Sequence, residues 1–393
     1  MQVRRMINKG LLEFIGSFLL CGILAAGLWP FHSPPNQVSW LDTTNGLRFG
    51  DHGTILSSGI LPMTGWQDEP ACSLEIWLES GKIRQANSFL AFYTPEHTHL
   101  FSLHQELTDL ALEGEVQNQQ KETRTAAFYV GGAFRRKTPI FIAIAAGPRK
   151  TAVYLDGHLV RVSQRFLLSN KNCNGRLIIG NSAVANSGWS GELRGLAIYN
   201  RELTGAEILR HYVTWTRKGE PDIANSEGNV WLYLFDEHRG RVAHNKAKLS
   251  AGAAAAALQG PDLYIPDRYL VVAPVFLGPP WNEFEPSWSY LEDALTNIAG
   301  FIPLGFVFQA YFSERKIKRG AAAAIILGGI VSLTIEVLQS YLPTRSSDMT
   351  DVITNTAGTL LGTMLYGYNP FQNVVREALN RVRKTPVIPN VNA

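Results

Sequence analysis

The chain has 393 residues, of which 46% are hydrophobic and 18% are charged, and its formal net charge at pH 7 is +3. This net charge is close to zero, and no basic patch with interleaved aromatic residues is present. Charge therefore gives no reason to infer nucleic-acid binding. The length allows about two or three domains. The average composition conceals two populations, because long apolar runs lie near both ends whereas the middle is polar and strand-like.

The first apolar run covers residues 10–29 and follows a basic segment, residues 1–9, that contains Arg4, Arg5 and Lys9. About 20 apolar residues in a helix cross a bilayer core, so this run predicts a transmembrane anchor with a cytoplasmic N-terminus. The alternative is a signal peptide cleaved at the small residues Ala25-Ala26-Gly27. We favour the anchor, and under either interpretation the segment that follows is exported.

Residues 38–265 alternate short apolar runs with turns rich in Gly, Asn, Asp and Pro. This pattern is typical of an all-β sandwich or jelly roll. The clearest predicted strands cover residues 73–78, 140–145, 151–155 and 176–180. The Asp156-Gly157 pair separates two apolar runs and predicts a tight β-hairpin.

Several segments of this region share a resemblance with one family: residues 46–50, 74–77, 153–157, 177–180, 191–199 and 200–208. They resemble concanavalin A-like domains of the laminin-G type, in which the last two segments form a closing strand and a short helix. A similar strand motif at 231–237 extends the resemblance toward residue 265. The resemblance implies binding of glycans or proteins, in some members through calcium.

The residues themselves predict no cofactor. No clustered acidic loop marks a calcium site, so calcium in the sandwich stays an open implication of the resemblance. Asp236 and Glu237 are neighbours that point to opposite faces if extended, unlike the paired carboxylates of related glycoside hydrolases. Trp189 has two interpretations, an exposed ring that stacks on a sugar or a ring packed beneath a turn.

The chain has cysteines at positions 21, 72 and 173. Cys21 lies in the first apolar run, whereas Cys72 and Cys173 lie in the middle region. If that region is exported, these two are candidates for a disulfide, and the alternative is a pair of buried free thiols.

Three more apolar runs, residues 290–312, 320–342 and 351–368, predict an all-α unit of four transmembrane helices together with the first run. The loop 313–319 and the tail 369–393 are basic, as is the N-terminus, and basic flanks mark the cytoplasmic side. This predicts a protein of the bacterial inner membrane with both termini cytoplasmic and the sandwich extracytoplasmic, a periplasmic domain. The linker 266–289 contains a Pro-rich apolar piece, residues 269–281, too short to span, which predicts an interfacial segment with Trp281 and Trp288 near the headgroups.

Polar residues inside the predicted membrane helices are candidate functional residues, because burying them in lipid is costly. They fall on helix faces at intervals of one turn and, with the outer loop 343–350, predict a polar site in the outer leaflet. Pro303 predicts a kink, and a Gly358/Gly362 stripe predicts close helix packing. The candidate site residues are Asp293, Asn297, Ser332, Glu336, Gln339, Arg345, Asp348, Asp351 and Asn355.

The segments 297–305, 332–339 and 345–358 resemble the VanZ-like membrane family in order, spacing and apolar context. In that comparison the domain covers residues 290–368, the first helix supplies the family's first span, and the sandwich is an insertion into the first outer loop. The family is named for a protein that gives low-level resistance to a glycopeptide antibiotic. The resemblance implies a role in the cell envelope but no reaction.

Three functional hypotheses follow. In the first, Glu336 and Asp351 bind the polar headgroup of a lipid-linked envelope precursor, with Arg345 pairing with an anionic group, or act on it as general acid or base. In the second, the chain is a non-catalytic subunit of a larger membrane complex, the sandwich docks on partner proteins, and Asp348 with Asp351 caps the last helix. In the third, the sandwich binds an envelope glycan. We favour binding over catalysis; the expected partners are membrane lipids, an envelope glycan or lipid-linked precursor, or protein subunits, and no nucleic acid.

Overall fold

The computed structural model describes residues 9–61, 71–117, 123–184, 188–223, 229–247, 260–272, 276–280, 288–342 and 344–368. It divides into a sandwich unit, Ser33–Pro274, and a helical unit, which consists of Met1–His32 together with Val275–Ala393.

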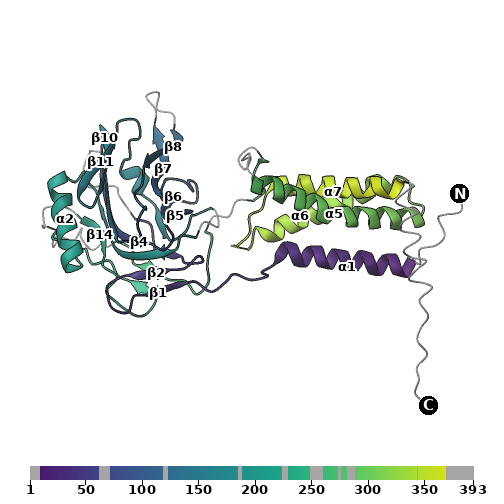
Figure 1. Cartoon of the computed structure of the whole chain (residues 1–393), viewed down its shortest axis with the longest axis horizontal. Coiled ribbons are helices and arrows are strands. Elements are labelled where there is room, and N and C mark those ends of the chain that lie inside the picture. Colours follow the sequence, from purple (N-terminus) through teal and green to yellow (C-terminus); the bar gives the residue numbers. More distant parts are fainter. Residues whose placement is uncertain are drawn as a thin grey trace, which may run out of the picture. The chain divides into compact units, whose positions relative to one another are not determined.

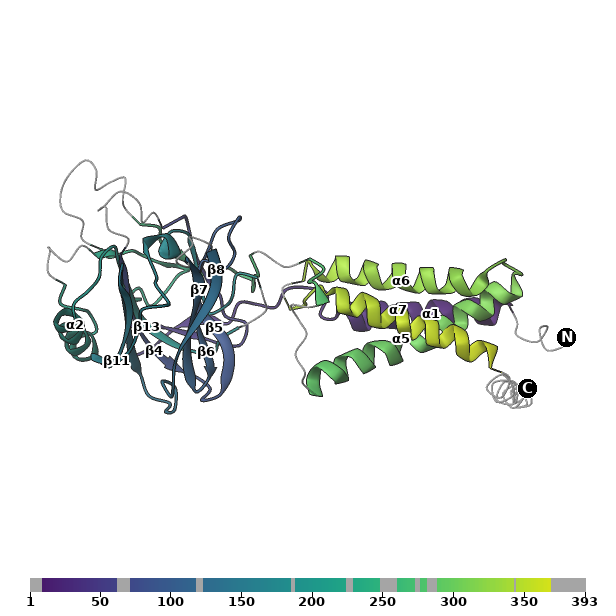
Figure 2. The same cartoon turned by 90° about the horizontal axis from the view of Figure 1, so that it is seen from above.

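The sandwich unit contains two antiparallel sheets that face one another (Figures 1 and 2). The first sheet has the order β1-β2-β13-β4-β9-β10-β11, with β14 also paired to β13. Its strands are β1 (Val38–Trp40), β2 (Leu47–Phe49), β13 (Gly191–Tyr199), β4 (Cys72–Ser80), β9 (Ile140–Gly147), β10 (Lys150–Leu155), β11 (His158–Ser163) and β14 (Asn229–Tyr233).

The second sheet has the order β15-β16-β3-β12-β5-β6-β7-β8. Its strands are β15 (Val242–Ala243), β16 (Leu263–Tyr264), β3 (Ile55–Ser57), β12 (Arg176–Ile179), β5 (Gln85–Tyr93), β6 (Phe101–Leu107), β7 (Asp109–Gln117) and β8 (Thr123–Val130). A 3-10 turn, η2 (Asn170–Cys173), precedes β12. The predicted β-sandwich is confirmed.

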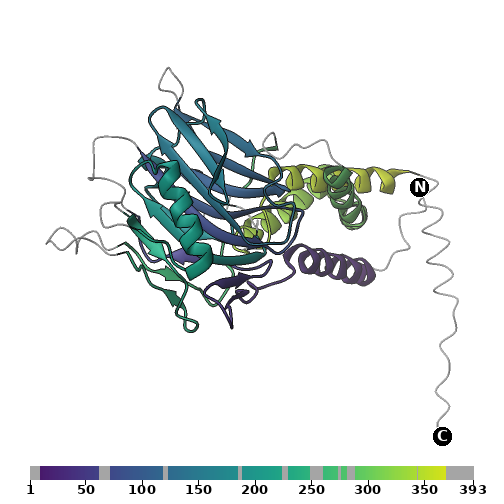
Figure 3. The ribbon, with the colours of Figure 1, turned by 60° about the vertical axis from the view of Figure 1, so that its left-hand side comes forward.

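The β4 strand shows how the sequence builds two apolar layers. Leu74, Ile76 and Leu78 alternate along it and pack in the core between the sheets, as the two-residue period of a strand requires. Glu75 and Trp77 point to the opposite face. There the helix α2 (Gly205–Lys218) covers the sheet through Ile208 and Trp215 and forms a second apolar layer (Figure 3).

The hairpin predicted at Asp156-Gly157 is present. Leu155 pairs with His158 across a two-residue turn, with φ of 49° at Asp156 and 79° at Gly157. Positive φ at both central residues is the geometry of a type I′ turn, which matches the twist of the flanking strands. Helix α2 is longer than the short helix expected at 200–208, and it begins at a capping box made by Thr204 and Glu207.

The structure decides between the two interpretations of Trp189 and corrects the interfacial expectation for Tyr269. Trp189 is 1% exposed, packs in the core, and its indole N–H donates to Gln105 Oε1 at 3.2 Å. It is not available to stack on a sugar. Tyr269, which opens the predicted interfacial piece, is fully buried in the sandwich unit, where its ring meets His52 edge-on. Trp281 and the side chain of Trp288 lie outside the described residues.

The helical unit contains α1 (Lys9–Leu28), α5 (Trp288–Glu314), α6 (Gly320–Gln339) and α7 (Met349–Gly367) (Figure 2). Within the described residues, two stretches are long and apolar enough to cross a membrane, Tyr290–Glu314 and Gly320–Gln339. Leu12–Leu28 forms a shorter apolar helix. Pro303 lies inside α5, as expected.

Helices α5 and α7 approach so closely that only glycine fits at their contact. A Cβ added at Gly358 would lie 2.2 Å from the Ile298 carbonyl oxygen, and one at Gly362 would lie 2.1 Å from that of Ile302. Small residues that let helix backbones meet are the usual device of packing between membrane helices. The close packing predicted from this glycine stripe is therefore observed.

Candidate functional site: a polar cavity in the helical unit

A cavity of about 520 Å³ lies within the helical unit. Every candidate site residue except Ser332 lines it, and they come from α5, α6, α7 and the loop between α6 and α7. The C-terminal end of α1 closes the cavity with small and apolar residues. The lining residues are Ile23, Ala26, Gly27, Asp293, Thr296, Asn297, Gly300, Phe301, Ile335, Glu336, Gln339, Arg345, Ser346, Asp348, Asp351 and Asn355.

Sequence reasoning missed two polar lining residues, Thr296 and Ser346. Thr296 follows Asp293 by three positions, so the helical spacing that links neighbours on one face could have found it. Ser346 carries no comparable signal, because it lies in an irregular loop whose course depends on the helices around it.

A hydrogen bond joins the α5 and α7 walls of the cavity. Asn297 Nδ2 donates to Asp351 Oδ1 at 2.8 Å. Asp351 lies in the first turn of α7, where the positive end of the helix dipole stabilises a carboxylate. Asp293 lies one turn before Asn297 on α5, so two carboxylates from different helices face the same cavity.

The α6 wall is tied to its neighbours on two sides. Glu336, only 1% exposed, accepts the Asp348 backbone N–H at Oε2 over 2.8 Å. Gln339 Nε2 donates to the Gly27 carbonyl oxygen at 2.9 Å, which links α6 to α1. Ser332 is fully buried and accepts from Asn355 Nδ2 at 2.9 Å, so it supports the lining without reaching the cavity.

Arg345 binds backbone carbonyls and not the carboxylates that it was expected to reach. Its Nε and Nη2 donate to the Trp29 carbonyl oxygen at 3.0 and 2.7 Å, and Nη2 also approaches the Ala26 carbonyl oxygen at 3.4 Å. Among the described residues, no ion pair joins this guanidinium to a carboxylate. The unsatisfied carbonyls at the C-terminal end of α1 attract it instead.

The expected cap of the last helix is also different. Asp348 stands at the N-cap of α7 with an extended backbone, φ −126° and ψ 133°, but its side chain makes no capping hydrogen bond. The carboxylate therefore remains a wall of the cavity, and the backbone N–H of Asp348 is held by Glu336.

Acceptors outnumber donors around the cavity. Four carboxylates line it, from Asp293, Glu336, Asp348 and Asp351, and the guanidinium in the lining is bound to backbone carbonyls. The amide oxygens of Gln339 and Asn355 are buried without a hydrogen-bond partner. In the part of the chain that the structure describes, no group of three or more His, Cys, Asp or Glu residues is placed to hold a metal ion.

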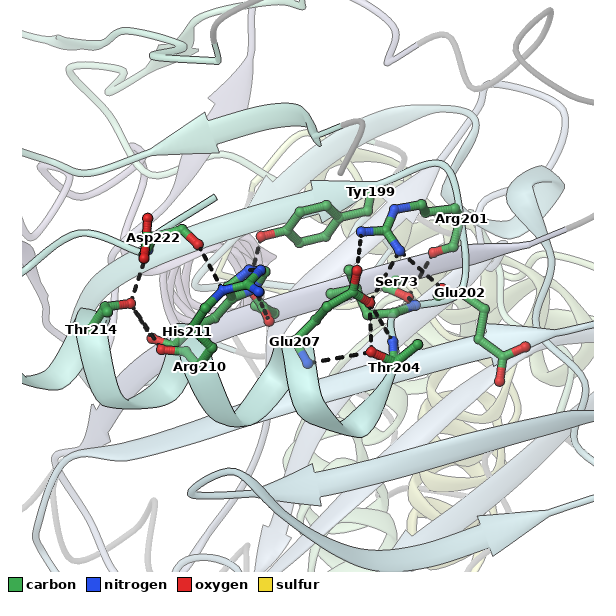
Figure 4. A network of polar contacts seen from close by, with 12 residues as sticks. Ser73, Tyr199, Arg201, Glu202, Thr204, Glu207, Arg210, His211, Thr214 and Asp222 are labelled. Atoms are coloured by element: carbon green, nitrogen blue, oxygen red, sulfur yellow. Dashed lines mark hydrogen bonds and ion pairs between the residues drawn. The ribbon is translucent and has the colours of Figure 1, made fainter. Parts of the chain in front are cut away.

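The sandwich unit holds a second polar cluster that the sequence did not reveal (Figure 4). Glu75 on β4 and His211 on α2 are fully buried, and His211 Nδ1 lies 2.9 Å from Glu75 Oε1. Tyr199 on β13 donates to Glu75 Oε2 at 2.8 Å. Burial and the neighbouring Glu75 carboxylate raise the pKa of Tyr199 well above its ordinary value. With no solvent access, this cluster fastens α2 to the sheet.

The described residues thus form a two-sheet β-sandwich and, in the helical unit, a polar cavity among apolar helices. Residues 260–369 match the family model described as VanZ/LLP1, and residues 57–209 match that of the concanavalin A-like lectin/glucanases superfamily. The chain is 34% identical to Protein VanZ of Enterococcus faecium over 91 residues. This matched region is 23% of this chain and 53% of that protein. The chain thus spans about half the length of this relative. Both resemblances noted in the sequence are confirmed.

Solved structures resemble the sandwich at low identity. The binding domain of botulinum neurotoxin DC in complex with rat synaptotagmin II is 13% identical, with a TM-score of 0.34 over 47% of this chain and 46% of that one. The binding domain of Paraclostridial Mosquitocidal Protein 1 is 10% identical, with a TM-score of 0.36 over 47% of each chain. The heptameric SAP-like pentraxin of Limulus polyphemus is 12% identical, with a TM-score of 0.29 over 46% of this chain and 80% of that one.

Proposed function

We propose that this chain is a membrane protein of the cell envelope that binds the polar headgroup of a lipid-borne ligand in the cavity of its helical unit. One observation carries the proposal: in a unit with two apolar candidate spans, polar side chains from three helices and a loop converge on one cavity of about 520 Å³. Polar and ionisable residues within membrane segments are costly and usually mark a ligand pathway. The match to VanZ/LLP1 supports an envelope location.

The proposal places α1, α5, α6 and α7 in the membrane, with both termini in the cytoplasm. Arg315, at the end of α5 in the basic loop, bonds to Glu13 near the start of α1 at 3.0 Å. Asp293 and Gly27, at the opposite ends of those two helices, line the cavity. Since basic loops stay in the cytoplasm, the cavity then opens on the extracytoplasmic side.

The lining favours a ligand that is rich in hydrogen-bond donors, such as a headgroup with an ammonium or several hydroxyls. Four carboxylates and two buried amide oxygens accept hydrogen bonds, whereas the guanidinium of Arg345 is already bound by carbonyls. Charge-assisted hydrogen bonds between an ammonium or hydroxyl and a carboxylate are among the strongest available in a protein. A concanavalin A-like sandwich on the same chain is compatible with an envelope glycan as part of that ligand.

Native mass spectrometry of the full-length protein, extracted gently from its own membrane, tests the proposal. We expect a bound lipid that is lost in Glu336→Gln, because an amide keeps the size and one acceptor but removes the charge. Glu13→Gln is the matched control, since it makes the same change outside the cavity. Equal lipid retention by wild type and Glu336→Gln would refute a headgroup site at Glu336.

The second candidate function is a non-catalytic subunit of a membrane complex, and one contact favours it. The bond from the Asp348 N–H to Glu336 gives this buried carboxylate a structural task, the anchoring of the α6–α7 loop. Under this alternative Glu336→Gln behaves as wild type, because the amide oxygen still accepts that bond. Glu336→Leu alone destabilises the unit, and native mass spectrometry finds a stoichiometric protein partner without a specific lipid.

A further inference from the structure

The two cysteines of the sandwich unit lie side by side in its core. Cys72 Sγ and Cys173 Sγ are 3.5 Å apart, and the residues are 2% and 1% exposed. Cys72 opens β4 in the first sheet, whereas Cys173 ends η2, just before β12 of the second sheet. The thiol pair therefore bridges the two sheets, although 101 positions separate the residues in the sequence.

We propose that Cys72 and Cys173 form a structural disulfide in the native protein, which staples the two sheets of the sandwich together. A disulfide requires the sulfurs to approach to about 2.05 Å, so a shift of under about 1 Å by each side chain closes the gap. The enclosed loop is long, and cross-links across long loops remove the most conformational freedom from the unfolded chain. The inference rests on the extracytoplasmic placement of the sandwich, because only an oxidising compartment sustains such a bond.

The bond forms by thiol–disulfide exchange with a disulfide oxidant of that compartment. One cysteine thiolate attacks a sulfur of the oxidant, which releases one oxidant thiol and leaves a mixed disulfide. The second cysteine thiolate attacks the mixed disulfide at the protein sulfur and releases the second oxidant thiol. The two protein thiols are oxidised to one disulfide, and the oxidant disulfide is reduced to two thiols that take up the two protons.

Because both sulfurs are buried in the folded unit, the disulfide is expected to form before folding is complete. The neighbouring Cys72 and burial raise the pKa of the Cys173 thiol well above its ordinary value, so Cys173 forms little reactive thiolate in the folded unit. Exchange is therefore expected while the sandwich is folding and both thiols are still exposed. Once formed, the disulfide is enclosed by the core and resists reductants until the unit unfolds.

Thiol counting on the full-length protein extracted from its native membrane tests the proposal. The protein is denatured with N-ethylmaleimide and no reductant, and its peptides are mapped. We expect a label on Cys21 alone and a linked peptide that contains Cys72 and Cys173; prior reduction of the denatured protein should then give labels on all three cysteines. Labels on Cys72 and Cys173 without reductant would overturn the proposal.

A second arm separates failure of the bond from failure of the placement. Purified full-length protein is unfolded, reduced and refolded with oxidised glutathione. If a Cys72–Cys173 bond forms here but is absent from the native extract, the placement of the sandwich outside the cytoplasm is wrong. If the Cys72–Cys173 bond forms in neither sample, the two sulfurs are not placed to form a disulfide. Both outcomes refute the proposed native disulfide. Neither affects the proposed ligand site, because ligand loss in Glu336→Gln is measured independently.

Discussion

His211 on α2 and Glu75 on β4, which are 136 positions apart in the sequence, face each other across a distance of 2.9 Å with both side chains fully buried. The pair holds a helix against the outer face of a sheet at a point that water does not reach. Tyr199 adds a hydrogen bond to the same carboxylate, so three polar groups satisfy one another within an apolar layer.

Removing one member of this group should destabilise the sandwich strongly. In His211→Phe the Glu75 carboxylate stays buried without its imidazole partner, and breaking a buried pair in this way costs about 3–5 kcal/mol. The loss of unfolding free energy is measured by urea unfolding of the full-length protein. Hydrogen exchange of the α2 amides reports whether the helix itself is released. A change below about 1 kcal/mol would show that α2 is held by its apolar contacts alone.

The matched variant removes all three polar groups together, as Glu75→Leu, Tyr199→Phe and His211→Phe in one chain. Buried polar partners can be replaced together by apolar residues at little cost, because none of the three then stays buried without the others. We expect this variant to recover most of the stability that His211→Phe loses. A triple variant weaker than His211→Phe would contradict the account.

The contact between α5 and α7 gives a second prediction. Gly362→Val places a branched side chain where even a Cβ would lie 2.1 Å from a backbone oxygen, so the helices must separate. We expect a loss of about 1–3 kcal/mol and a lower melting temperature of the detergent-solubilised protein. Gly22→Ala in α1 is the control, since nothing lies within 4 Å of its added Cβ. Equal melting temperatures for the two variants would rule out this contact as a main stabiliser.

Local patterns in the sequence were sufficient for most elements and for most of the cavity lining, although they missed Thr296 and Ser346 and included Ser332, which does not line it. The Asp156-Gly157 turn follows from backbone preferences, and the stripe of Ser332, Glu336 and Gln339 follows from helical spacing. Such patterns say which face a residue occupies but not which partner it finds there. Arg345 illustrates the difference, because its carbonyl partners lie at and just beyond the C-terminal end of α1, more than three hundred positions away.

Long-range pairs were the part that sequence patterns could not reveal. Glu75 occupies a position that strand alternation places on the outer face, and His211 is a single histidine in an amphipathic helix. Neither carries a spacing signal for the other, because they meet only when β4 and α2 pack together. Trp189 was open to two interpretations for the same reason, since its burial depends on β-strands from both sheets.

The Asp156-Gly157 hairpin supplies a third prediction. Gly157→Ala should cost more than Gly240→Ala, although the two glycines have nearly equal φ values of 79° and 82°. Both substitutions place a Cβ in the left-handed region, which costs about 1–2 kcal/mol. At Gly157 the Cβ also meets α2, 2.9 Å from a Leu209 carbon, whereas nothing lies within 4 Å at Gly240. Equal urea midpoints for Gly157→Ala and Gly240→Ala would show that α2 moves away from the hairpin without loss of stability.

The N-terminal end of α2 predicts how acid affects the sandwich. Burial alone would raise the pKa of Glu207, but hydrogen bonds from Arg201 and Thr204 outweigh it and lower the pKa to about 2. An unperturbed glutamate has a pKa of about 4.3. Because the folded pKa lies below the unfolded one, Glu207 stabilises the fold fully above that value, and the contribution is lost as pH falls toward the folded pKa.

Glu207→Gln isolates this contribution. The amide cannot ionise, so the variant should be less stable than wild type near neutral pH, and the difference should shrink as pH falls through the acid range. Urea midpoints of the full-length protein at a series of pH values measure it, with exposed Glu220→Gln just beyond α2 as the control. The control should keep the wild-type pH dependence. If the difference in urea midpoint between wild type and Glu207→Gln stays constant with pH, the charge of Glu207 does not contribute to stability. The Arg201 and Thr204 hydrogen bonds would then stabilise α2 equally well with a neutral side chain.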